Sequence, residues 1–140
     1  MKFAQSIQIN VTSDKVFEVY QNVKQWSEWN SGIEFSSISG PFKTGTKGEL
    51  KHLTGPINKI FFNEVTHNKS FTTVRKLPLC MMYCEHKLSS NENGTNVTHK
   101  VRFKGILAPL FGRLIGKNIK QDLPTVMNSL KKHLEKTVSQ

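Results

Sequence analysis

Two histidines on either side of a turn sequence are the residues whose type and spacing best suit chemistry. His86 and His99 flank Asn93-Gly94, a pair that favours a tight turn between two antiparallel strands. If Ser90 pairs with Thr95 across this turn, His86 lies directly opposite His99. A neutral imidazole both donates and accepts a hydrogen bond, and its usual pKa of about 6.5 also permits proton transfer.

Three roles are open to this histidine pair. The two rings can hydrogen-bond to each other or to buried water, contact a ligand carbonyl or hydroxyl, or move protons as general acid and base. Two histidines fall short of a metal site, because no Asp or Glu occupies an obvious third-ligand position. We therefore expect no metal and no cofactor, and the sequence alone assigns no catalytic residue.

Alternation along the two strands around the turn places both histidines on an apolar face. The inward set of the strand predicted at 81–90 includes Cys84, and that of the strand predicted at 95–104 includes Val101 and Phe103. We predict that this face lines a cavity. The opposite face of the second strand is basic and carries Lys100, Arg102 and Lys104.

Arg75 is a further candidate for ligand contact. In the strand predicted at 70–77, the face that carries Arg75 is more apolar than the opposite face, so the side chain is expected to point inward. There its guanidinium group could bind a ligand carboxylate. The alternative is an arginine at the rim of the sheet, paired with Glu64 or Glu49.

The N-terminal part of the chain must supply one strand and two short helices. Ser6–Val11 alternates in hydrophobicity as a half-buried strand does. Thr12-Ser13-Asp14 then offers N-cap oxygens to a short helix. Trp26 and Trp29 follow at the spacing of one helical face, which predicts a second short helix.

Glycine and proline divide the next part of the chain into short strands. Gly40-Pro41 and Gly55-Pro56 are typical of turns, as is Asn93-Gly94 further along. These breaks predict six more strands, at 33–39, 47–53, 57–65, 70–77, 81–90 and 95–104.

The C-terminal part is predicted to be helical. A stripe of apolar residues recurs there at helical spacing, with charged residues on the other side, and we expect it to lie against the concave face of the sheet. The stripe comprises Leu123, Val126, Met127, Leu130 and Leu134. Pro124 lacks a backbone N–H, which predicts a kink or a break at that point.

The segment before Pro124 is predicted to be a mobile gate. It is apolar over more of its circumference and contains Gly112 and Gly116, which lower helical rigidity. We expect Leu110, Phe111 and Leu114 to guard the mouth of the cavity.

Composition limits the function classes and the partners. The net charge is +10, from 20 Lys and Arg against 10 Asp and Glu, so the surface could meet an acidic partner. Nucleic-acid binding is not expected, because the arginines and aromatic groups that read bases are scarce. No signal peptide and no apolar stretch long enough to span a membrane are evident, which predicts a cytoplasmic protein. Cys80 and Cys84 lie too far apart along one strand to form a disulfide.

The order of elements and several short motifs resemble the helix-grip fold of START-like and Bet v 1-like proteins. The motifs are similar to those of the polyketide cyclase/dehydrase branch of that superfamily. They are I-x-I at Ile7 and Ile9, S-D-x-V-F from Ser13, W-x-x-W at Trp26 and Trp29, Glu85-His86, G-T-x-V-T-H from Gly94 to His99, and Gly105. The resemblance implies an α+β fold in one domain, residues 1–140. A seven-stranded curved antiparallel sheet would wrap a long C-terminal helix, with two short helices after strand 1.

The resemblance also implies a cavity between the sheet and the last helix that binds lipids, polyketides or similar hydrophobic molecules. We expect a carrier or sensor of a small hydrophobic molecule. The alternatives are a polyketide cyclase or dehydratase that uses the cavity histidines, and a basic interaction module for an acidic partner. No catalytic motif is shared across the superfamily, so none is transferred to this chain. The predicted cavity residues are Trp29, Arg75, Cys84, His86, His99, Val101, Phe103, Leu110, Phe111, Leu114 and Met127.

Overall fold

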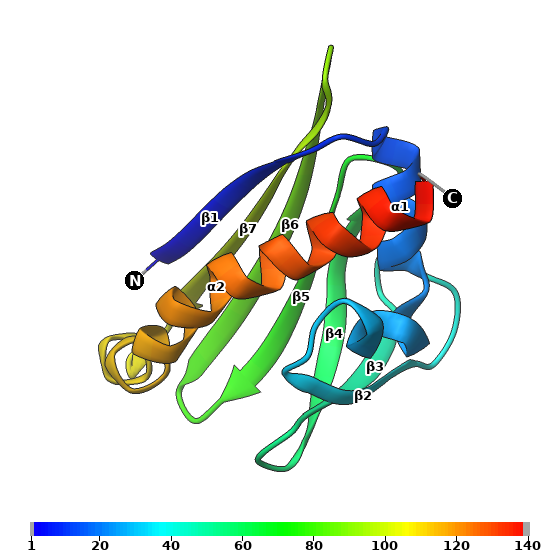
Figure 1. Ribbon diagram of the computed structural model, residues 1–140. Coiled ribbons are helices and arrows are strands. Elements are labelled where there is room, and N and C mark those ends of the chain that lie inside the picture. The colour runs from blue at the N-terminus through cyan, green and yellow to red at the C-terminus, as the bar shows by residue number, and fades with distance from the viewer. Residues whose placement is uncertain (1, 139–140) are drawn as a thin grey trace.

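The computed structural model describes residues 2–138 and contains one antiparallel sheet and three helical segments (Figure 1). The elements are β1 (Lys2–Ile9), α1 (Ser13–Gln21), the 3-10 helix η1 (Val23–Glu28), β2 (Ile33–Ile38), β3 (Lys47–His52), β4 (Ile57–Thr66), β5 (Ser70–Leu77), β6 (Cys80–Asn91), β7 (Gly94–Lys104) and α2 (Ala108–Val138). Strands β2 to β7 each lie within one residue of their predicted bounds.

The seven strands form a single curved sheet in the order β1-β7-β6-β5-β4-β3-β2, with every neighbouring pair antiparallel. Strands β2 to β7 form a meander in which each strand pairs with the next one in the chain. Strand β1 pairs with β7 and lies at the edge of the sheet. Helix α2 crosses the concave face of the sheet, and α1 and η1 pack at its far end (Figure 1). The predicted helix-grip architecture is therefore confirmed.

The first strand differs from its predicted bounds. It begins at Lys2 and ends at Ile9, so the prediction that it continues to Val11 is wrong. The reason is its partner, because Ile9 already pairs with Thr95 at the start of β7. Val11 is nevertheless buried, and its carbonyl accepts a hydrogen bond of 2.8 Å from the Thr95 hydroxyl.

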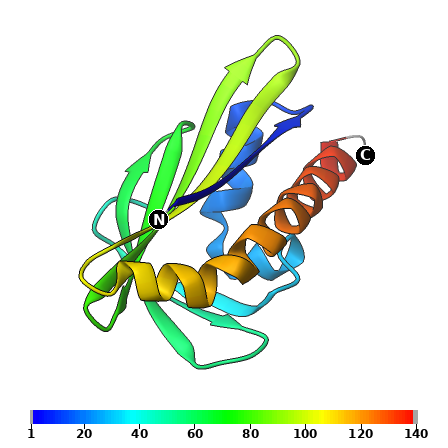
Figure 2. The same cartoon turned by 90° about the vertical axis from the view of Figure 1, so that its left-hand side faces the viewer.

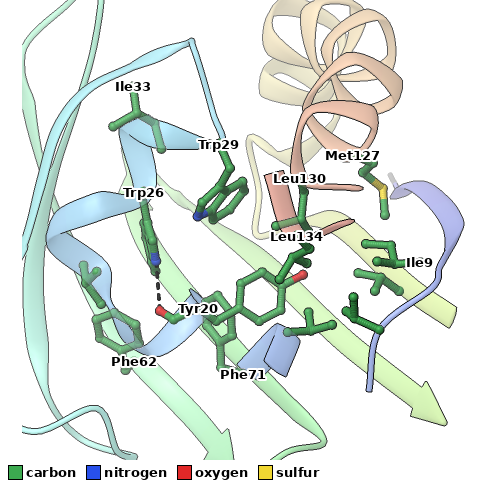
Figure 3. Close-up of a cluster of buried hydrophobic side chains, with 14 of the residues drawn as sticks. Ile9, Tyr20, Trp26, Trp29, Ile33, Phe62, Phe71, Met127, Leu130 and Leu134 are labelled. Atoms are coloured by element: carbon green, nitrogen blue, oxygen red, sulfur yellow. Dashed lines mark hydrogen bonds between the residues drawn. The ribbon is translucent and has the colours of Figure 1, made fainter. Parts of the chain in front are cut away.

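The main core lies between the sheet and the second half of α2 (Figure 3). Met127, Leu130 and Leu134 of α2 are almost completely buried, which confirms that the predicted stripe faces the sheet. They lie with buried aromatic rings from α1, η1 and the residue after it, β4 and β5. These are Tyr20, Trp26, Trp29, Phe62 and Phe71.

Helix α2 is continuous through Pro124, so the predicted break is wrong and only the kink remains. Figure 2 shows the first part of the helix running across the view before the chain turns upward toward the C-terminus. One proline removes a single intrahelical hydrogen bond, and burial of the stripe on the other side of the bend compensates for that loss.

The first half of α2 packs on a second apolar cluster, formed with β1 and β7. Phe3 and Phe103 meet there edge to face, with ring centroids 6.5 Å apart, and Phe111 and Ile115 of α2 cover them. A side chain at Gly116 would overlap the ring of Phe3, so this glycine permits close approach of helix and strand. The glycine therefore serves packing here.

Candidate functional site

A cavity of about 350 Å³ lies between the inner face of the sheet and the middle of α2. Its walls come from β2 to β7, from η1 with the loop that follows it, and from one face of α2. The wall is mainly apolar and includes Trp26, Ile33, Leu50, Ile60, Phe71, Met82, Ile119, Leu123 and Val126. A volume of this size suits a small organic molecule.

Six of the eleven residues predicted for the cavity lie in its wall. They are Trp29, Arg75, Cys84, His86, His99 and Val101. Five come from inward positions of β5, β6 and β7, where strand alternation determines the face that a side chain occupies. Trp29 follows η1 and reaches the same space from the opposite side.

The other five predicted residues lie outside the cavity wall. Phe103 and Phe111 belong to the second apolar cluster, and Met127 is completely buried in the main core. Leu110 and Leu114 are exposed, because the opposite face of α2 packs on β1 and β7. The predicted gate is therefore not supported, and Ile119 and Leu123 approach the cavity in its place.

The two histidines face each other across β6 and β7, as the turn sequence predicted. His86 pairs with His99, and their ring centroids lie 4.4 Å apart in an edge-to-face arrangement. His86 also stacks on Phe71 at 4.0 Å. The pair is thus held within an aromatic wall of the cavity.

Tyr20 is a hydrogen-bonding neighbour of this histidine pair that the sequence did not reveal. Its hydroxyl lies 2.7 Å from Nε2 of His99, a buried hydrogen bond between α1 and β7. Its helical spacing with Val16, Phe17 and Val23 indicates only a core residue of the first short helix. No local pattern indicates where the hydroxyl ends, because its partner lies 79 residues away.

Burial keeps these groups neutral. It lowers the pKa of His86 to about 4, with the backbone carbonyls of Phe71 and Cys84 opposing the shift, and it lowers the pKa of His99 well below 6.5. Burial also raises the pKa of Tyr20. The imidazoles therefore act as hydrogen-bonding groups at neutral pH, and a cationic or proton-shuttling role is disfavoured.

Two buried nitrogen atoms of the cavity wall have no hydrogen-bond partner within the described part of the chain. They are Nε1 of Trp29 and Nδ1 of His86. A buried polar group without a partner costs about 1–3 kcal/mol, so such groups usually meet water or a ligand. The neighbouring Trp26 is different, since its Nε1 donates to the backbone carbonyl of Tyr20 at 2.9 Å (Figure 3).

Arg75 lies in the cavity wall without an ion-pair partner among the described residues. The alternative partner Glu64 accepts hydrogen bonds from the hydroxyls of Ser70 and Thr72. Partial burial lowers the pKa of Arg75, although a guanidinium group keeps its charge at neutral pH. Arg75 thus gives the wall a cation without a carboxylate partner in the described part of the chain, and Glu85 and Asp122 line other parts of the cavity.

Cys84 lies beside Arg75 in the wall, and burial raises the pKa of its thiol to about 11. It therefore stays protonated at neutral pH and is a weak nucleophile. Both cysteines are free. No group of three or more His, Cys, Asp or Glu in the described residues could hold a metal ion.

Two cations of the basic strand face on the outside of the sheet already have partners within the chain. Arg102 donates through Nε to Glu85 at 2.9 Å, and its guanidinium group lies 4.6 Å from the ring centre of Tyr83. Lys104 approaches the same ring at 5.8 Å. These contacts leave less free charge for an acidic partner than the sequence suggested.

Comparison with known proteins identifies the family model that the chain matches. Residues 1–135 match the model described as polyketide cyclase / dehydrase and lipid transport. No curated protein sequence matches the chain. Within residues 2–138, no helix is long and apolar enough to cross a membrane.

Solved structures share the fold at low sequence identity. Protein MLL2253 of Mesorhizobium loti is 17% identical with a TM-score of 0.78, and the match covers 98% of each chain. Ara h 8.0201 is 12% identical with a TM-score of 0.76, over 97% of this chain and 98% of that one. DynU16, from the dynemicin biosynthetic locus, is 14% identical with a TM-score of 0.74, over 96% of this chain and 47% of that one.

Proposed function

Because the chain belongs to the polyketide cyclase/dehydrase and lipid transport family, we propose that it binds a small hydrophobic molecule as a carrier or sensor. The observation that carries the proposal is the mainly apolar cavity of about 350 Å³ between the sheet and α2. Such a wall favours ligands whose apolar surface is removed from water on binding, and the few polar groups in it determine how the ligand is oriented.

Three polar groups suggest which ligands suit the cavity. Trp29 and His86 present buried nitrogens without partners, which suit a carbonyl or hydroxyl oxygen. Arg75 presents an unpaired cation, which suits a carboxylate. The proposed ligand is therefore an apolar molecule with an oxygen-bearing, acidic end.

Replacement of Arg75 by Gln should weaken binding of an acidic ligand. A charge-assisted hydrogen bond is lost, so the affinity for a fluorescent polyene fatty acid should fall by about tenfold or more. The affinity for the corresponding fatty alcohol, which has no carboxylate, should change little. Fluorescence titration of both probes measures the two affinities.

Lys76→Gln is the matched control, because Lys76 is the next residue of β5 and is exposed on the other face of the sheet. It removes the same charge without touching the cavity. Equal weakening by both variants would indicate a general effect of surface charge, and the assignment of Arg75 to the ligand would be wrong.

A cyclase or dehydratase is the second candidate function. The observation that favours it is the buried Tyr20–His99–His86 cluster, whose two histidines line the cavity. Such an enzyme needs turnover of a polyketone that depends on these side chains. Full activity of both His86→Ala and His99→Ala on a turned-over substrate would exclude this mechanism.

A further inference from the structure

Large apolar side chains gather in water at one end of the molecule. Leu79 in the β5–β6 turn is 66% exposed, and Ile106 in the β7–α2 loop is 81% exposed. In the first turns of α2, Leu110 is 47% exposed and Leu114 is 64% exposed. We refer to these four residues as the end patch. Two of them, Leu110 and Leu114, were predicted from the sequence to form part of a gate.

The two loops of the end patch are joined by a hydrogen bond. The backbone N–H of Leu107 donates to the carbonyl of Leu79 at 3.1 Å, and α2 begins at Ala108 directly afterwards. Figure 2 shows the yellow loop before α2 beside the end of the green strands. The four side chains thus come from adjacent segments at one end of the molecule.

Leu79 adopts a backbone conformation that leucine rarely takes. Its φ is 51°, in the left-handed region that Gly or Asn occupies at lower cost. The side chain is exposed, so internal packing does not explain a leucine at this turn. An external contact would explain it.

The exposed face of α2 next to the patch alternates apolar and cationic residues. Leu110, Arg113, Leu114 and Lys117 fall at i, i+3, i+4 and i+7, and all four are exposed. The opposite face, with Phe111 and Ile115, packs on the second apolar cluster. The solvent-exposed face of this half of α2 therefore carries both apolar and cationic side chains.

The two chain segments that supply the end patch carry only positive formal charge. Neither segment 65–84 nor segment 93–121, which together supply the end patch, contains an Asp or a Glu. Lys104, Arg113 and Lys117 are exposed close to the patch in sequence. A large apolar patch with basic neighbours on a water-exposed surface marks an interaction site.

We propose that the end patch docks on the surface of a membrane that contains anionic lipids. Its apolar side chains enter the boundary between head groups and acyl chains, and Arg113 and Lys117 meet lipid phosphates. A second copy of the chain is a poorer occupant, because a two-fold contact would bring cations against cations without a counter-charge. The docking does not depend on what fills the cavity.

Flotation with lipid vesicles tests the proposal. The full-length protein should float with vesicles of phosphatidylcholine and about one-third phosphatidylserine, and only weakly with phosphatidylcholine alone. Binding to the anionic vesicles should fall steeply as salt rises from about 0.05 M to about 0.5 M.

Two pairs of substitutions separate the apolar and the electrostatic contributions. Ile106→Ser with Leu114→Ser keeps every charge and should weaken vesicle binding by about tenfold or more. Arg113→Gln with Lys117→Gln should weaken it by about tenfold and flatten its salt dependence. All four side chains are exposed, so circular dichroism and thermal unfolding should match the wild type.

Matched controls use exposed residues outside the end patch. Leu53 and Ile57 are 63% and 51% exposed at the β3–β4 turn, so Leu53→Ser with Ile57→Ser removes similar apolar surface. Lys24→Gln with Lys132→Gln removes the same charge from η1 and the second half of α2. Both controls should bind vesicles as the wild type does.

Three results would overturn the proposal. They are no binding of the wild type to anionic vesicles at low salt, equal binding by the end-patch variants, or equal weakening by the controls. Light scattering supplies one more decisive outcome. If the wild type is a dimer in solution and Ile106→Ser with Leu114→Ser makes it a monomer, the patch is a contact between copies and the membrane assignment is wrong.

Discussion

Acidification from about pH 7 to about pH 5 is expected to reduce the free energy of unfolding by roughly 2 kcal/mol through His86, and to reduce it further through His99. Both rings are buried and neutral in the folded protein, with the pKa of His86 lowered to about 4 and that of His99 also well below 6.5. At these two positions the unfolded chain binds protons as the pH falls through about 6.5, whereas in the folded protein the rings stay neutral until the pH approaches their lowered pKa values. The contribution of these rings to the free energy of unfolding is thus fully present above about pH 6.5, and it is lost as the pH falls toward 4.

Urea unfolding of the wild type and of His86→Gln at both pH values measures this contribution. The variant lacks one of the two depressed groups, so its loss of stability on acidification should be smaller by about 2 kcal/mol. Carboxylates contribute to acid unfolding in both proteins, and the comparison removes that contribution. Equal losses for the two proteins would show that His86 titrates normally in the folded state.

Replacement of Leu130 by Ala should cost about 2–5 kcal/mol of stability. Leu130 is completely buried in the main core, where α2 meets the sheet, and the truncated side chain would leave a void there. Leu114→Ala is the matched control, since it makes the same change on the same helix at an exposed position. The control should change stability by less than about 0.5 kcal/mol.

Thermal or urea unfolding of these variants also tests the corrected role of Phe111. Phe111 packs in the second apolar cluster, away from the cavity wall, so Phe111→Ala should lower stability and leave uptake of a fluorescent fatty acid unchanged. A stable Phe111→Ala protein with altered uptake would restore the gate predicted from the sequence.

The strands and the histidine pair could be predicted because short-range rules determine them. Turn residues such as Asn93-Gly94 set the register, and alternation then decides which face each side chain occupies. His86 therefore faces His99, as the turn sequence indicated, and Arg75, for which the sequence also left a rim position open, lies in the cavity wall. The same rules placed Met127 and Leu130 on the buried side of α2.

Long-range packing could not be predicted in the same way. The orientation of the first half of α2 depends on its contact with β1 and β7, where Gly116 admits the ring of Phe3. Apolar residues occur around much of that segment, so periodicity does not show that Phe111 packs and Leu114 is exposed. The hydrogen bond between Tyr20 and His99 is likewise a product of tertiary structure.

Burial also limits the chemistry that is open to the two histidines. An exposed imidazole titrates at about 6.5 and can move protons at neutral pH. In the cavity wall both rings are desolvated, and their lowered pKa values favour hydrogen bonding to a ligand over proton transfer. For this reason we propose ligand binding as the first function and acid–base catalysis as the second.

Native mass spectrometry of the wild type and of Thr73→Trp tests the ligand-binding cavity most directly. Thr73 is buried in the cavity wall on β5, so an indole at this position would fill part of the space that a ligand needs. The wild type should carry one small hydrophobic molecule from its host or take up one added fatty acid, and folded Thr73→Trp should carry neither. A wild type that stays empty with fatty acids, fatty alcohols and polyketide-like probes, or a Thr73→Trp variant that binds them equally well, would contradict the account.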